Sequence, residues 1–432
     1  MMQSLSVRTL LIATILLIVW PAYAANNITR DVGEIAIIEA DTNIIYTATD
    51  TNGNPCPQVT VNKKELAKKF YQTHSDDFQF LIMYTNFDYL ISPKTDCSNR
   101  AAALHNLVSN SITGIGRNTV DNSALYGSSG VLESFLSMSN VNGWQVDPTA
   151  HNLVGNNSML SLLGQEAGHR WLAFVQFDLP GPGITASNAL LGRANSHWSF
   201  FHHATSATSS GANPEASSAQ GNYWEVDQPV AGSFQTTTIV DGFSPLDLYL
   251  MGLLPSSQVP SFWYISLPDA VVPAATATSN SRAGTTAQGT QTFVSINDVI
   301  TAEEARNPTS VDSPKVFRQA FVLLTSQGVD VTQAEIDQVD RYRRAWEAYF
   351  GEETQKRGAV LTDLGAVLFV DSANTGAELG TLRFPFNTVT EGRDYIPSGG
   401  TVVITAGSYP ENLIFNASMT LKSVLGTTHI GQ

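Results

Sequence analysis

The segment from Gln165 to His169 places a carboxamide, a carboxylate and an imidazole within five residues. Gln165 and His169 are four residues apart, so on a helix their side chains lie one turn apart on the same side and can share one metal ion. Glu166 could take a proton from a water molecule that attacks a carbonyl group. Gly168 lets another part of the chain approach the helix closely. The spacing therefore favours a metal site on one side of a helix, with Glu166 as either a general base or a ligand.

Apolar periodicity predicts the elements that must hold these groups. The best helical pattern of the first half runs from Met159 to Phe177 and contains the segment above. A second helix is predicted from Gln333 to Phe350, with aromatic residues at helical spacing that indicate core packing. A shorter helix is predicted over Lys63–Thr73, and the apolar run Phe78–Tyr84 is typical of a buried strand. The first of these helices would position the amide, the carboxylate and the imidazole.

Three stretches of the chain resemble the zincin-like secreted metallopeptidases. The sequence LLGQEAGHRWLAFVQF resembles their active-site helix, whose motif H-E-x-x-H appears here as Q-E-x-x-H. Ser196–Ser199 (SHWS) lies where such proteins often supply a further ligand, and Phe243–Gly252 (FSPLDLYLMG) resembles the turn beneath their metal. The resemblance covers about residues 75 to 350. It implies an α+β zincin-like domain with an active-site helix, zinc or another divalent metal as cofactor, a protein or peptide substrate, and Glu166 as catalytic base.

The chain departs from that family at the first metal ligand. Gln165 stands where the motif has His, and an amide oxygen is a poorer zinc ligand than an imidazole nitrogen. Val175 stands where a compact motif would place a third His. A third ligand must then come from downstream, with His197 as the first choice and Asp247 as the second.

Three arrangements of the site follow from this departure. In the first, His169, His197 and Asp247 bind the metal. Gln165 is then either a weak ligand or a residue that contacts the ligands without binding the metal. In the second, Glu166 and His169 are both ligands, as in carboxylate metal sites, and the general base is lost. In the third, no metal binds, and the protein is a catalytically inactive zincin scaffold that acts as a cell-surface or carbohydrate-binding module. The sequence leaves all three open.

The C-terminal segment, from about residue 366, has a different periodicity. Short strands are predicted at LFVD, TVVIT, NLIF and MTLKS, separated by Gly, Asn, Pro and Ser turns. With the series D-x-x-x-x-G, P-F-x-T-V and G-x-Y-x-E-N, this spacing resembles the beginning of a right-handed parallel β-helix of the pectate-lyase type. The resemblance implies polysaccharide as an alternative partner. Two or three coils fit into residues 366–432. Either they dock on the larger domain, or the chain is a shortened version of a longer protein.

The N-terminus and the cysteines indicate the compartment. Arg8 is the only charge in the first 24 residues, and it is followed by the apolar run Leu10–Trp20 and the small-x-small triplet Ala22–Ala24. This pattern is typical of a cleaved secretory signal peptide, so we expect a secreted protein, extracellular or periplasmic. Cys56 and Cys97 are expected to pair there. Such a disulfide closes a loop of about 40 residues and stabilises the fold by about 3–4 kcal/mol.

Net charge and local composition exclude some classes of partner and suggest where the domains begin and end. The formal charge of −15 argues against nucleic acid or an anionic membrane as a partner, and no segment after the signal peptide is apolar enough to span a membrane. The expected units are a signal peptide (1–24), a zincin-like metallopeptidase-like domain (25–365) and a partial parallel β-helix (366–432). Residues 204–222 and 273–292, rich in Ser, Thr, Ala and Gly, are interpreted as exposed loops or insertions.

Overall fold

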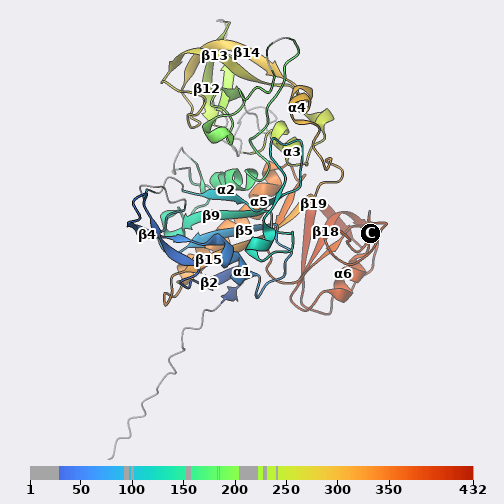
Figure 1. Cartoon of the computed structure of the whole chain (residues 1–432). Helices are drawn as coiled ribbons and strands as arrows, with labels where there is room; N and C mark the ends of the chain where they lie inside the picture. The colour runs from blue at the N-terminus through green and yellow to red at the C-terminus, as the bar shows by residue number, and fades with distance from the viewer. Residues whose placement is uncertain are drawn as a thin grey trace, which may run out of the picture.

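The computed structural model describes residues 29–91, 97–98, 102–151, 157–181, 183, 185–203, 222–226, 231–239 and 242–431. They form a mixed sheet with helices on both faces, a small β-barrel above it, and a set of parallel strands beside it (Figure 1). The predicted signal peptide lies outside the described residues. None of the described helices is both long and apolar enough to cross a membrane. The α-helices are α1 (Lys63–Phe70), α2 (Met159–Gly168), α3 (Pro245–Leu250), α4 (Ile296–Glu303), α5 (Gln333–Glu353) and α6 (Val389–Tyr395).

The central sheet has the strand order β1-β2-β15-β5-β9-β6, and β16 pairs with β15. Strands β2, β15, β5 and β9 are parallel, whereas β1 and β6 at the edges run antiparallel to their neighbours. The strands are β1 (Thr29–Val32), β2 (Ile35–Glu39), β5 (Phe80–Thr85), β6 (Leu104–Leu107), β9 (Ser134–Asn140), β15 (Val316–Thr325) and β16 (Ala359–Leu361). Two small hairpins accompany the sheet: β3 (Ile45–Thr49) with β4 (Pro55–Val61), and β7 (Ser109–Asn110) with β8 (Val120–Asp121).

Strand β15 shows why helices cover both faces of this sheet. All of its residues are buried, as is usual for a parallel strand between two helical layers. Successive side chains point to opposite faces. Phe321 and Leu323 belong to the core that contains α2 and α5, whereas Val322 and Leu324 belong to the core under α1. The predicted buried strand at Phe78–Tyr84 is confirmed as β5, shifted by one or two residues.

Helix α5 confirms the prediction for the second half of the chain. Thr332 caps it in a reciprocal pair of hydrogen bonds with Glu335, a capping box. The predicted apolar stripe is buried against α2 and the sheet, including the fully buried rings of Tyr342, Trp346 and Phe350. The aromatic residues of this helix therefore form core, as their spacing indicated.

Helix α2 is shorter than its apolar pattern predicted. It ends at Gly168, so the expected continuation to Phe177 is wrong. The residues after the helix are apolar because they enter the core as an irregular segment: the ring of Trp171 lies 5.9 Å from that of Phe80 and 5.2 Å from that of Phe317. A buried helix and a buried irregular segment have similarly apolar sequences. The sequence pattern therefore did not show where the helix ends and the irregular segment begins.

Beyond α2 the chain leaves the central sheet and forms a closed barrel with the strand order β10-β11-β12-β14-β13. Its strands are β10 (His202–His203), β11 (Asn222–Val226), β12 (Ser233–Ile239), β13 (Phe262–Val272) and β14 (Thr286–Val294). The interpretation of 273–292 as a loop is wrong for its second part, which is β14. This strand looks polar because much of it is exposed, while Ala287 and Val294 are buried. Of the expected loop 204–222, only residue 222 lies within the described residues.

The C-terminal region contains the parallel strands β17 (Val367–Val370), β18 (Thr401–Tyr409) and β19 (Thr420–Ile430). They correspond to three of the four predicted strands. The fourth, NLIF at residues 412–415, is wrong: no strand forms there. Strand β18 is already paired with β17 on one side and with β19 on the other. The NLIF segment therefore cannot pair with β18 as a further strand. Its Ile414 and Phe415 are exposed instead.

These parallel strands dock on the central sheet. Phe369, Val403 and Val424 form one apolar cluster with Val316 and Leu361 of the larger region. Lys422 of β19 completes the contact, because its ammonium group lies 2.6 Å from a carboxylate oxygen of Asp363 and 3.2 Å from one of Glu347. Docking was one of the two alternatives that the sequence left open for this segment.

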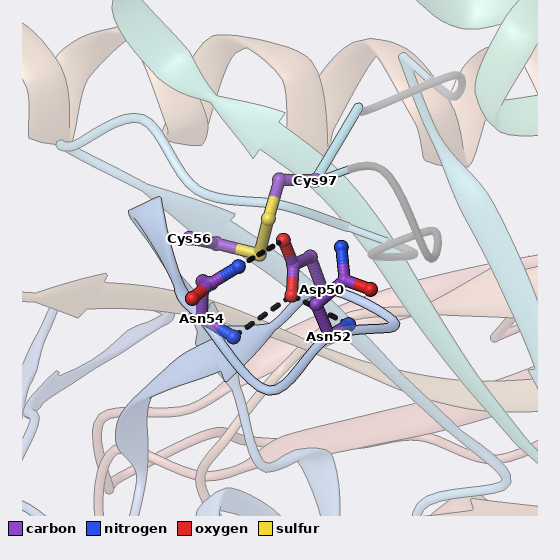
Figure 2. The surroundings of a disulfide bond; sticks show 5 residues. All are labelled: Asp50, Asn52, Asn54, Cys56 and Cys97. Atoms are coloured by element: carbon purple, nitrogen blue, oxygen red, sulfur yellow. Dashed lines mark hydrogen bonds between the residues drawn. A yellow bond between two sulfur atoms is a disulfide. The ribbon is translucent and has the colours of Figure 1, made fainter.

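The predicted disulfide joins Cys56 and Cys97, with Cα atoms 5.4 Å apart (Figure 2). Cys56 lies in β4, just after the turn from β3, and the carboxylate of Asp50 accepts the backbone N–H groups of Asn52 and Asn54 in that turn. The hairpin therefore has its own closing hydrogen bonds, and the disulfide ties it to the segment that follows β5.

Candidate functional site

The motif lies at the C-terminal end of α2, between the central sheet and the barrel (Figure 1). Ser158 caps the start of this helix through a capping box with Ser161. At the other end His169 is the C-cap, and its backbone N–H donates to the carbonyl oxygen of Gln165 at 3.0 Å. The one-turn relation between Gln165 and His169 is therefore present, although the helix stops immediately afterwards.

A tight turn between Leu191 and Trp198 brings His197 to this helix end. Leu191 and Trp198 form an antiparallel bridge, and the Gly192 N–H donates to the carbonyl oxygen of His197 at 2.8 Å. A Cβ atom on Gly192 would lie 2.6 Å from a neighbouring carbonyl oxygen, so only glycine fits. Inside the turn, Nδ1 of His197 lies 2.9 Å from the carbonyl oxygen of Arg193. The turn therefore places Arg193 and His197 together at this end of the helix.

The fold brings Gln165, His169 and His197 into contact. Their exposed fractions are 4%, 8% and 9%, so all three are largely shielded from water. The two imidazole rings are nearly perpendicular, with centroids 4.8 Å apart. Nε2 of Gln165 lies 3.4 Å from Nε2 of His197, and the buried Oε1 of Gln165 has no hydrogen-bond partner among the residues that the structure describes. A buried oxygen without a partner is costly, which indicates a place for a further group.

Hydrogen bonds fix the tautomer of both imidazoles. Nδ1 of His169 lies 3.2 Å from the carbonyl oxygen of Leu172, and Nδ1 of His197 contacts the carbonyl oxygen of Arg193. A carbonyl oxygen only accepts, so each Nδ1 carries the proton and each Nε2 keeps its lone pair. Burial lowers the pKa of His169 to about 4 and that of His197 to about 3, so both rings are neutral at pH 7. Metal-binding imidazoles have this kind of partner on the second nitrogen.

Glu166 is buried near the antiparallel edge strand β6. Its carboxylate accepts a hydrogen bond from the backbone N–H of His105, a residue of that strand. Burial raises the pKa of Glu166 to about 7, against the opposing effects of this N–H and of the positive charge of Arg193. A carboxyl group with a pKa near neutrality can accept and return a proton, as a general base must.

Two residues that the sequence analysis missed lie around His169. The ring centroid of His105 is 6.3 Å from that of His169. Arg117 donates to the carbonyl oxygen of His169 at 2.5 Å, and its guanidinium lies 4.2 Å from the ring centroid of Phe174. Both come from segments more than 50 positions before His169 in the chain. No local pattern marks them, so only the folded chain reveals them.

Arg193 was also missed, although its spacing gave a signal. It precedes His197 by four residues, and one terminal nitrogen of its guanidinium donates to Nε2 of His197 at 2.9 Å. The other terminal nitrogen donates to Oδ1 of Asn280 at 3.2 Å. A guanidinium therefore lies directly on the imidazole nitrogen that a metal ion would need.

Asp247, the second choice for a third ligand, is engaged elsewhere. Its Oδ1 accepts the indole N–H of Trp198 at 2.9 Å, and its Oδ2 accepts the backbone N–H of Ser244 at 2.8 Å at the start of α3. The side chain is completely buried. Asp247 thus anchors Trp198, the residue directly after His197. The FSPLDLYLMG segment forms this short helix and its cap.

We expect Asp247→Asn to lower the free energy of unfolding by about 1–3 kcal/mol, because an amide has one accepting oxygen for two buried N–H donors. Urea denaturation measures the change. The matched control is Asp330→Asn, since Asp330 is exposed. Equal stability of the two variants would contradict the anchoring role.

Two further histidines downstream of the motif, His202 and His203, lie outside the group formed by Gln165, His169 and His197. They form strand β10 of the barrel. His202 is 1% exposed, and the ring of His203 stacks on that of Trp263 with centroids 4.4 Å apart. The ring of His202 also lies against that of Trp198, the residue after His197, with centroids 5.2 Å apart.

The motif brings together imidazole and amide groups, which are of the chemical kinds that bind metal ions. Across the described part of the chain, no three His, Cys, Asp or Glu side chains lie close enough to hold a metal ion, so Asp247 and Glu166 complete no such group. Nε2 of His169 keeps its lone pair and the buried amide oxygen of Gln165 has no partner among the described residues, whereas Nε2 of His197 already accepts from the guanidinium of Arg193. Nitrogen and oxygen donors of this kind suit zinc, although the amide is its weakest protein ligand here.

Comparison with known proteins gives no guide to the function, because no family model, curated protein or solved structure matches the chain. The function has to be argued from the geometry of the motif.

Proposed function

We propose that this protein is an exported, metallopeptidase-like hydrolase of peptide bonds. In this proposal His169, His197 and Gln165 hold a divalent cation, with zinc as the best fit, and Glu166 is the general base. The main observation in support is that the buried imidazoles of His169 and His197, with ring centroids 4.8 Å apart, both donate from Nδ1 to backbone carbonyl oxygens. Nε2 of His169 is thereby left for a ligand at the end of the helix that carries Glu166. In this proposal Nε2 of His197 binds the cation after the guanidinium of Arg193 has moved away from it.

The chemistry follows from the roles that each side chain can take. A bound divalent cation supplies Lewis-acid polarisation of the carbonyl group to be attacked. Glu166 accepts the proton of the attacking water and returns it to the leaving amine. The neighbouring β6 backbone orients its carboxylate through the N–H of His105. The small exposed fractions of the motif residues reduce competition from bulk water.

A second candidate function is supported by the contact between Arg193 and His197. A guanidinium that donates to Nε2 of His197 at 2.9 Å competes with a cation for the same lone pair. This favours a catalytically inactive scaffold that acts as a cell-surface or carbohydrate-binding module. We rank it second because the unpartnered oxygen of Gln165 and the tautomers of both imidazoles have no explanation in that role.

The metal content of the purified chain tests the first proposal against the second. We expect about one zinc per chain at micromolar zinc, and an affinity lower by at least about 10–100-fold in His169→Ala. Elemental analysis and competition with a fluorescent chelator measure both quantities. His429→Ala is the control, since His429 lies on β19 of the C-terminal region. A protein that binds no zinc under these conditions would rule out the metallopeptidase and favour the binding module.

A further inference from the structure

The last of the parallel strands, β19, borders a groove between the C-terminal region and the central sheet. The groove has a volume of about 490 Å³, and its walls are residues 422–427 of β19, the C-terminal part of α5, and β16 with the residues just before it. None of the residues that line it belongs to the motif at the end of α2. An occupant of this groove therefore goes beyond the proposed function and does not depend on it.

One edge of β19 has no partner strand in the described part of the chain, because the sheet has the order β17-β18-β19. The backbone N–H of Thr420 donates to the carbonyl oxygen of Gly400, the residue before β18, at 2.9 Å. Backbone groups alternate between the two edges of a strand, so the N–H and C=O groups of Leu421 and Ser423 point away from β18. The ligand that matches such alternating donors and acceptors is an extended polypeptide.

The side chains around this edge indicate which peptide fits. Leu421 is in register with Val402, which belongs to the apolar cluster inside the parallel strands, yet Leu421 is 39% exposed. An apolar side chain on a further strand would cover it. The groove contains two acidic and two basic side chains, those of Glu347, Glu352, Lys356 and Lys422. It is therefore close to neutral, although the chain carries a formal charge of −15, and this balance favours an uncharged peptide over a basic one.

We infer that the groove binds a short, extended, uncharged peptide segment of another protein, which pairs with β19 as a fourth strand. The backbone of the peptide bonds to Leu421 and Ser423, and one of its apolar side chains covers Leu421. The pairing stays short, because a bulge at Leu425 and Gly426 interrupts β19 where its register with β18 shifts. The same bulge prevents pairing along the whole strand, which would favour aggregation.

Binding of a capped, fluorescent peptide to the full chain tests this inference by fluorescence anisotropy. The peptide has the sequence TVVITA, residues 401–406, which carries no charge and already pairs with the other edge of β19 as part of β18. We expect a Kd below about 0.5 mM. A second peptide with Pro in place of both Val residues lacks adjacent N–H donors on its two edges, and it should bind at least about tenfold more weakly.

Two variants of the chain test whether the peptide lies in the groove. Ser423→Pro removes an N–H that points away from β18 and leaves the ladder between β18 and β19 intact, whereas its control Ser423→Ala keeps this N–H. Gly351→Phe fills the groove from α5, where a Cβ atom would have no neighbour within 4 Å, and Gly351→Ala is its control. We expect the Pro and Phe variants to weaken binding by at least about tenfold and both Ala controls to stay within about twofold of the wild type.

Absence of binding at about 0.5 mM would overturn the inference, and so would an affinity within about twofold of the wild type in a folded Ser423→Pro or in Gly351→Phe. If circular dichroism shows that Ser423→Pro does not fold, Gly351→Phe decides alone. Sedimentation of the chain is measured at the same concentrations. A dimer that Gly351→Phe abolishes would assign this edge to a second copy of the chain and would likewise overturn the inference. A zinc chelator is present throughout, so that hydrolysis of the peptide at the motif does not contribute.

Discussion

Glu166→Gln should lower the rate of peptide hydrolysis by about 10²–10⁴-fold, the usual contribution of a general base. The amide has nearly the same size as the carboxyl group, but it cannot accept the proton of the attacking water. Its oxygen can still accept the hydrogen bond from the backbone N–H of His105, so the fold should be preserved. Turnover of casein or an internally quenched peptide gives the rate, and elemental analysis gives the zinc content.

The combination of the two readouts decides the role of Glu166. Lost turnover with unchanged zinc identifies a general base, whereas lost zinc would identify Glu166 as a ligand, the second arrangement considered from the sequence. Glu352→Gln is the matched control, because Glu352 is an exposed residue of α5. Turnover that persists in Glu166→Gln would exclude Glu166 as the base.

Gln165→His should raise the affinity for zinc by at least about 10–100-fold, the range that supporting partners of a ligand produce by themselves. It replaces an amide by an imidazole at a side chain whose Nε2 already lies 3.4 Å from Nε2 of His197. Three imidazoles would then converge, and zinc prefers nitrogen to amide oxygen. We also expect faster peptide hydrolysis, since tighter binding fills more of the sites.

Competition with a fluorescent chelator measures this gain in zinc affinity. The control Gln333→His introduces an imidazole at an exposed residue at the start of α5 and should leave the affinity unchanged. Adding His169→Ala to Gln165→His should cancel most of the gain, because both side chains would bind the same ion. An unchanged affinity in Gln165→His would show that position 165 does not face a metal.

The fold could be predicted wherever one face of an element is buried and the other is not. Helix α5 alternates apolar and charged residues at a helical period, and its position was predicted to within three residues. Strand β5 was recognisable because both of its faces are buried, which gives an unbroken apolar run. The irregular segment that contains Trp171 is equally apolar, and it was therefore mistaken for a continuation of α2.

Strand β14 escaped prediction for the opposite reason. It is rich in Thr, Gln and Gly, and much of it is exposed, so its composition is that of a loop. Its ladder with β13 and β12 is made by backbone groups, which every residue except proline can provide. The NLIF segment was mistaken for a strand because its apolar side chains suggested burial, whereas Ile414 is 72% exposed.

The sequence by itself determined the Gln165–Glu166–His169 spacing, because four residues make one helical turn whatever surrounds them. It also determined the cysteine pair, since only two cysteines exist to form a bond. Tertiary structure decided the rest of the site. His105, Arg117 and Arg193 reach the motif through the edge strand and two loops, and Asp247 is occupied by Trp198. Apart from the contact of Arg193 with His197, these contacts join residues tens of positions apart, and packing brings them together without any local pattern that a sequence could display.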